Sequence, residues 1–240
     1  MIEAVFISDL HLHPDEIQIT NKFHKFMDWA LQHTKNVYIL GDLFHVWPGD
    51  DGINAWSKSI ASRLRELTQH QIGLYYIHGN RDFLLGEQFA DLAGMKILAE
   101  PEVIQLGNEK VILAHGDRYC TKDTSHQWLR RLTRNKIFPR LFLKLPFKFR
   151  SKLVYAVRQH SQNGQKNMQN LDTVPDAMIR HMQEYKVSIL IHGHTHKPGL
   201  TVHERSKCSF RQYVLSDWDD TPLLMCYDKE NSLYFDQLLE

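Results

Sequence analysis

The stretch ILIHGHTHKPG, residues 189–199, joins an apolar run to three histidines at alternate positions. Its apolar part, residues 189–191, has the character of a strand that is buried on both faces. His192, His194 and His196 follow that part directly. The stretch is either a surface loop that happens to be polar or a strand that delivers metal ligands, and the rest of the chain decides between these interpretations.

The same pattern of an apolar run ending in polar residues occurs at four earlier places. These are AVFISDLH (4–11), NVYILGDLF (36–44), GLYYIHGNRD (73–82) and KVILAHGD (110–117). Amphipathic periodicity predicts helices over residues 19–33, 55–68 and 176–185. Strands that alternate with helices indicate a layered α/β fold, in which ligands collect beyond the carboxyl ends of the strands.

Seven side chains at or just beyond these strand ends are candidate metal ligands. They are Asp9, His11, Asp42, Asn80, His115, His194 and His196. In an extended chain, residues two apart point the same way. We therefore expect Asp9 and His11 to share a face, and likewise His194 and His196.

The donor set favours two divalent ions over one. Seven ligands exceed the four of a tetrahedral zinc site, and nitrogen and oxygen donors without a thiolate admit Mn²⁺, Fe²⁺ or Zn²⁺. The oxygen share favours Mn²⁺, at two ions per chain. Two metals about 3.5–4 Å apart suit phosphoester hydrolysis. Asn80 adds an oxygen without negative charge, and Arg81 either offers its guanidinium to phosphoryl oxygens or forms a surface salt bridge.

The motifs SDLHL, GDLF, GNRD, HGD and GHTH resemble, in order, those of the calcineurin-like metallophosphoesterases. The resemblance implies a single domain over residues 1–240, built as a β-sandwich of mixed sheets flanked by helices. It also implies two ions with a bridging Asp42. The first ion would be held by Asp9, His11, Asp42 and His196, and the second by Asp42, Asn80, His115 and His194.

Residues 124–171 contain no acidic residue and eleven basic ones, whereas the rest of the chain has 18 basic and 28 acidic residues. Large apolar residues alternate with these charges, as in IFPRLFLKLPFKF (137–149). We expect a helical cap inserted above the metal site. Its mixed surface fits an anionic membrane, a nucleic-acid backbone, or plain packing on the core with solvated charges. Trp47, Phe83 and Trp128 are candidates to line an apolar slot beneath it.

The cap and the longer matches YILGDLF, IHGNRDFLLG and LIHGHTH resemble the branch of that family that acts on UDP-2,3-diacylglucosamine in lipid A biosynthesis. The branch implies pyrophosphate cleavage by water attack on the α-phosphorus, which gives UMP and a sugar 1-phosphate. It implies peripheral attachment to the cytoplasmic face of the inner membrane. The implied catalytic residues are Asp42, Asn80, Arg81 and His194. The implied substrate contacts are Asn80, Arg81, Asp123, Arg158, Ser161, Asn163, Lys166 and His194.

Composition narrows the remaining alternatives. The formal net charge of +1 gives no global argument for nucleic acid, which we do not expect as a partner. The N-terminus does not read as a signal peptide, no run is long enough to span a membrane, and we expect a monomer. The three cysteines have neither zinc-like nor paired spacing, so we expect reduced thiols.

The alternative enzyme function is that of a soluble phosphodiesterase or pyrophosphatase acting on dinucleotides or nucleic acid. A scaffold without metals would lack ligands, and no ligand is missing.

Overall fold

The computed structural model describes residues 1–135, 137–163, 172–205, 207–230 and 232–238. Its strands are β1 (Ala4–Ile7), β2 (Asn36–Ile39), β3 (Gly73–Tyr76), β4 (Lys96–Ile97), β5 (Glu102–Leu106), β6 (Glu109–Ala114), β7 (Ile189–His192), β8 (Gly199–Arg205), β9 (Cys208–Val214), β10 (Leu223–Asp228) and β11 (Ser232–Gln237). Its α-helices are α1 (Ile17–His33), α2 (Ala55–Gln69), α3 (Glu87–Ala93), α4 (Thr124–Thr133), α5 (Phe138–Phe142), α6 (Phe147–Asn163) and α7 (Pro175–Glu184). Two short 3₁₀ helices are η1 (Asp50–Gly52) and η2 (Asp117–Tyr119).

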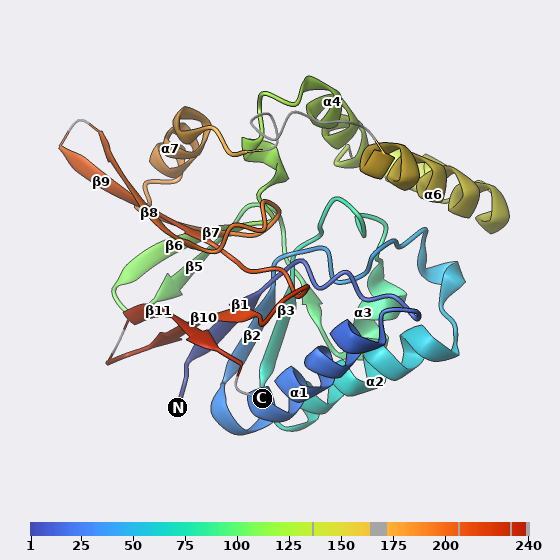
Figure 1. Cartoon of the computed structure of the whole chain (residues 1–240), viewed down its shortest axis with the longest axis horizontal. Helices are drawn as coiled ribbons and strands as arrows, with labels where there is room; N and C mark the ends of the chain where they lie inside the picture. Colours follow the sequence, from blue (N-terminus) through green and yellow to red (C-terminus); the bar gives the residue numbers. More distant parts are fainter. Residues whose placement is uncertain (136, 164–171, 206, 231, 239–240) are drawn as a thin grey trace.

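Two mixed sheets face each other, as the family resemblance implied. One has six strands in the order β11-β10-β1-β2-β3-β4, with β1 to β4 parallel, β10 antiparallel to β1, and β11 antiparallel to β10. The other has five strands in the order β5-β6-β7-β9-β8, with β6, β7 and β9 parallel and both edge strands antiparallel. In Figure 1, α1, α2 and α3 lie together on one side of the molecule, and α7 lies near β6 to β9.

The continuous apolar runs are explained by burial on both faces. In β1, Val5 and Ile7 pack with residues of α1, α2 and α3, whereas Ala4 and Phe6 point into the core between the sheets. In β7, Leu190 packs against α7, and its two isoleucine neighbours fill the core between the sheets. The expected helices 19–33, 55–68 and 176–185 are α1, α2 and α7, to within two residues at each end.

The helical segment formed by α4, α5 and α6 lies beside the loops that follow β1, β2 and β3 (Figure 1). Buried ionic contacts attach it to the rest of the chain. The Arg150 guanidinium is buried, donates to the Leu145 carbonyl at 2.9 Å and to the Pro48 carbonyl, and pairs with Asp51. Arg130 Nε lies 3.1 Å from Asp117 Oδ1. Some of the basic residues therefore fix this segment in place and are not simply solvated.

Two further expectations concern the whole chain. Within the described residues, no helix is both long enough and apolar enough to cross a bilayer. The cysteines are free, as expected, with Cys120 and Cys226 buried and Cys208 exposed.

Candidate metal centre

Five of the seven candidate ligands have left-handed backbone conformations, which non-glycine residues rarely adopt. The φ angles are 55° at Asp9, 53° at His11, 53° at Asp42, 72° at His194 and 54° at His196. Such a conformation costs about 1–2 kcal/mol per residue. The expected extended chain was wrong, because the chain turns at each ligand, but Asp9 and His11 still face one common ion site. Strain of this kind collects at functional sites.

Hydrogen bonds between neighbouring loops hold these turns. Asp9 N donates to the Gly41 carbonyl at 3.1 Å, and His11 N donates to the Asp42 carbonyl at 2.9 Å. The loops also approach too closely for side chains at two glycines. A Cβ at Gly79 would collide with the Asp42 carboxylate, and one at Gly193 would collide with the Asp9 carboxylate. These glycines therefore permit the ligands to come together.

Asp9, His11 and His196 form one potential ion site, with one ligand atom of each within 4.8 Å of the others. Asp9 Oδ1 lies 3.8 Å from His11 Nε2 and 3.4 Å from His196 Nε2. This oxygen is buried and has no hydrogen-bond partner in the described chain. A buried, unsatisfied carboxylate oxygen that faces two imidazoles fits a cation between them.

Asp9, Asp42 and His115 form a second, adjoining site, again within 4.8 Å. Asp42 Oδ1 lies 3.7 Å from His115 Nε2, while Asp42 Oδ2 lies 3.3 Å from His11 Nε2. The two oxygens of Asp42 thus face the two sites separately, which is the arrangement a bridging carboxylate needs. The His194 ring lies against His115, with centroids 5.0 Å apart.

The contacts of His115 give a further test of whether a cation fits. Its Nδ1 lies 2.9 Å from the Leu40 carbonyl, which can only accept a hydrogen bond, and its Nε2 lies 2.9 Å from Asn80 Oδ1. Both ring nitrogens therefore face acceptors. Either a proton on Nε2 or a cation shared with Asn80 resolves this contact, and an Nδ1-protonated imidazole is the usual metal ligand.

The charge balance keeps the two carboxylates ionised. Burial alone would raise the pKa of Asp9, but the neighbouring His196 and His115 rings lower that pKa below its ordinary value. Burial likewise opposes the ionisation of Asp42, and His115 and His11 more than compensate, so the pKa of Asp42 is also lowered. Two ionised carboxylates suit a pair of divalent cations.

Asp217 is a functional candidate that was not predicted from the sequence. Its Oδ2 lies 3.0 Å from His196 Nδ1, so it orients the ring whose other nitrogen faces Asp9. Lys22 Nζ holds the adjoining loop by donating to the carbonyls of Trp218, Asp219 and Asp220 at 2.8 to 2.9 Å. A signal was present: LSD (215–217) follows a strand, β9, and repeats the pattern of ISD (7–9) at the end of β1.

We expect Asp217→Asn to weaken metal binding about 10- to 100-fold, the range typical for partners that orient a ligand histidine. Calorimetric titration of the metal-free protein with Mn²⁺ measures this directly. The matched control is Asp219→Asn, because the Asp219 side chain is exposed and only its carbonyl binds Lys22. Equal Mn²⁺ affinity in both variants would show that Asp217 does not contribute to metal binding.

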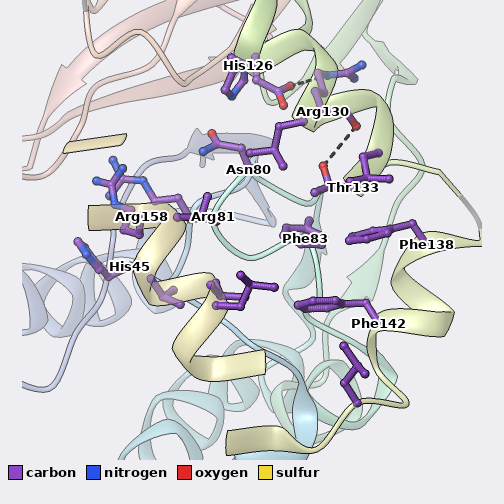
Figure 2. Close-up of a pocket in the computed structure, with 18 residues that line it drawn as sticks. His45, Asn80, Arg81, Phe83, His126, Arg130, Thr133, Phe138, Phe142 and Arg158 are labelled. Atoms are coloured by element: carbon purple, nitrogen blue, oxygen red, sulfur yellow. Dashed lines mark hydrogen bonds and ion pairs between the residues drawn. The ribbon is translucent and has the colours of Figure 1, made fainter. Parts of the chain in front are cut away.

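A cavity of about 400 Å³ opens beside the ligands, between the core and the helical segment. One end is polar, with His45, Asn80, Arg81, His126 and Arg158 (Figure 2). The remaining lining is largely apolar. Its residues include Phe83, Leu129, Phe138, Phe142, Leu153, Val154 and Val157. The cavity therefore suits a ligand with a charged group at one end and a hydrocarbon portion at the other.

Of the three aromatic residues expected to line an apolar slot, Phe83 alone does so. Trp47 is buried and stacks on Phe44, with ring centroids 4.6 Å apart. Trp128 is 67% exposed and does not line the cavity. Trp47 is therefore part of the hydrophobic core, and Trp128 lies on a helix face that is exposed to solvent.

The expected substrate contacts are placed as follows. Arg81 lines the cavity and is not a surface ion pair, because its Nε lies 3.2 Å from the buried Asp42 Oδ2. Arg158 also lines it, with a buried Nε that has no hydrogen-bond partner among the described residues. Asp123 caps α4, accepting from His126 N at 3.0 Å. Ser161 and Asn163 lie at the end of α6 with side chains outside the described part, and Lys166 lies outside the described residues.

Two adjoining sites of nitrogen and oxygen ligands, open to a cavity whose polar end carries Arg81 and Arg158, are typical of a metal-dependent phosphoester hydrolase. The chain belongs to the calcineurin-like phosphoesterase family, whose sequence model matches residues 3–198. It is thus a metallophosphoesterase, of a family that binds a dinuclear metal centre.

Similar proteins carry a more specific name. The UDP-2,3-diacylglucosamine hydrolase of Yersinia enterocolitica is 40% identical over 219 residues, covering 90% of this chain and 91% of that protein. The UDP-2,3-diacylglucosamine hydrolase of Pseudomonas paraeruginosa is 41% identical over 220 residues, covering 91% and 92%. Among solved structures, an archaeal phosphodiesterase matches with a TM-score of 0.48 and 11% identity, covering 98% of this chain and 97% of that one.

Proposed function

We propose that this enzyme hydrolyses the pyrophosphate of UDP-2,3-diacylglucosamine to UMP and 2,3-diacylglucosamine 1-phosphate, in lipid A biosynthesis. The observation that carries the proposal is the cavity, which joins arginines beside the metal ligands to an apolar chamber under α5 and α6. The names of the similar proteins support the same substrate. A dinucleotide has no hydrocarbon portion to occupy that chamber.

The chemistry follows from the donors and charges of the site. Asp9, His11, Asp42, Asn80, His115, His194 and His196 would hold two divalent ions, for which we propose Mn²⁺ because of the oxygen share of the donor set. When bound, the ions would supply the Lewis acidity that lowers the pKa of water and offsets the phosphoryl charge. Arg81 and Arg158 bind phosphoryl oxygens, and Asn80 is a neutral oxygen donor beside them. Burial lowers the pKa of His194 to about 3, so its imidazole is neutral and suited to ligation. The leaving sugar phosphate needs little protonation.

The helical segment is, in this proposal, a cap on a single domain that also contacts the membrane. Several of its large apolar side chains are exposed. They are Trp128, Ile137, Leu141, Leu143, Leu145, Phe149, Leu153, Tyr155 and Val157. Basic residues interleave with them, and each contributes about 1 kcal/mol near an anionic surface. We infer peripheral binding of a monomer to the cytoplasmic face of the inner membrane.

A paired substrate assay tests the proposed function. The purified protein with Mn²⁺ is incubated with UDP-2,3-diacylglucosamine in mixed micelles and, separately, with a dinucleoside polyphosphate. We expect UMP from the lipid nucleotide at a kcat/KM far above that for the dinucleotide. Preferential cleavage of the dinucleotide would favour the soluble pyrophosphatase alternative.

The apolar chamber can be tested with one leucine that lines it and one that does not. Leu153→Gln should lower kcat/KM for the diacylated substrate about 10-fold, because burying a leucine side chain contributes about 1.5–3 kcal/mol. Leu153 is 43% exposed, so the fold should tolerate the change. Leu141→Gln is the control, since Leu141 is 57% exposed and does not line the cavity. Equal kcat/KM values in the two variants would show that the apolar chamber does not bind the acyl chains.

A further inference from the structure

His45 stands at the polar end of the cavity without an assigned role. It follows β2, three residues beyond Asp42, and its backbone N–H donates to the Leu12 carbonyl at 3.0 Å. Figure 2 shows its ring on the same side of the cavity as the nitrogen-bearing ends of Arg81 and Arg158. The backbone is therefore fixed next to the metal ligands while the side chain faces the ligand space.

The His45 ring is half-buried, yet no hydrogen bond within the described chain engages either of its nitrogens. Among the residues that the structure describes, its one ring contact is with His13, edge-on, at 5.7 Å between centroids. Unpaired polar atoms lining a cavity beside a reaction site are available for a ligand. The structure therefore offers a donor that the protein itself does not use.

The surroundings of His45 point to an anionic partner. Burial, followed by the charges of Arg81 and Arg158, lowers the pKa of His45 to about 4, so the ring is neutral at physiological pH. Arg158 Nε is also buried without a hydrogen-bond partner among the described residues. Two guanidinium groups and an imidazole N–H facing one space complement phosphoryl oxygens better than an uncharged base or sugar.

We propose that His45 is a further substrate-binding residue, whose imidazole N–H donates a hydrogen bond to a phosphoryl oxygen of the pyrophosphate alongside Arg81 and Arg158. This rests on the proposed function to the extent that the substrate is a pyrophosphate. It adds a contact made by the loop that carries Asp42. A neutral donor orients the anion without adding a third positive charge to the crowded cationic end.

The experiment compares His45→Ala, His45→Gln and the control His13→Gln. A hydrogen bond to a charged group corresponds to about a 10- to 100-fold effect, so His45→Ala should lower kcat/KM for the lipid nucleotide by that factor. His45→Gln keeps an N–H donor and should recover most of the loss. His13→Gln, which alters the neighbouring ring outside the cavity lining, should match wild type.

Two readouts separate this proposal from its alternatives. Mn²⁺ affinity by calorimetry should be the same in all variants, which distinguishes a substrate contact from a disturbed metal site. If wild type cleaves only the dinucleotide, the proposed function fails, and the His45 comparison is still decided on that pyrophosphate. An unchanged kcat/KM in His45→Ala, or a His45→Gln variant as impaired as His45→Ala, would overturn the assignment.

Discussion

Replacing Asp42 with asparagine is expected to abolish metal-dependent hydrolysis, with kcat lowered about 1,000-fold or more. Asp42 places one oxygen toward His115 and the other toward His11, so its carboxylate lies between the two ion sites. Asparagine keeps the shape but replaces one oxygen with an NH₂ group that repels a cation. Losing about 4 kcal/mol of charge stabilisation corresponds to the stated factor.

The fold should survive Asp42→Asn because the retained Oδ1 can still accept the Arg81 backbone N–H, now at 2.9 Å. Steady-state hydrolysis, Mn²⁺ titration and thermal unfolding together separate the catalytic loss from unfolding. Asp15→Asn is the control, since the Asp15 side chain is 89% exposed on the loop after His11. Normal turnover in Asp42→Asn would rule out its bridging position.

The strands and the set of candidate ligands followed from sequence for a physical reason. Strands between two packed layers must be apolar on both faces, so β1 and β7 appear as unbroken apolar runs with abrupt polar ends. These polar ends lie at the edge of the sheet where the loops follow the carboxyl ends of the parallel strands. The family likeness implied two mixed sheets, but the pairing of β1, β2 and β3 in one sheet and of β6 with β7 in the other was predicted neither by that likeness nor by periodicity.

The local geometry of the site was less accessible from sequence. Periodicity describes regular chain, whereas Asp9 and His194 turn in left-handed conformations that only contacts between loops enforce. Asp217 lies on a segment far along the chain, and its role depends on a loop that Lys22 holds. The side on which Trp47 packs depends on Phe44 and Phe89, which sequence pattern alone does not place.

Arg81→Ala is expected to lower kcat about 100- to 1,000-fold, the cost typical of removing one donor to a developing anion. Arg81 Nε lies 3.2 Å from Asp42 Oδ2, and its side chain lines the cavity with only 14% exposure. The alanine variant thus removes a phosphoryl donor and also a charge that lowers the pKa of Asp42. Both effects act where the phosphoryl group must sit.

The size of the recovery in Arg81→Lys distinguishes these two effects. An ammonium group restores a positive charge near Asp42 but lacks the planar fork that binds two oxygens at once. We therefore expect Arg81→Lys to keep the Mn²⁺ affinity of the wild type while kcat stays at least about 10-fold low. Arg63→Ala is the control, because Arg63 is similarly buried, 16% exposed, and pairs with Asp28 and Glu66 outside the site. Full activity in Arg81→Lys would mean that a positive charge alone is required at this position. Full activity in Arg81→Ala would exclude Arg81 from catalysis. Phosphoryl binding at the polar end of the cavity would then depend on Arg158.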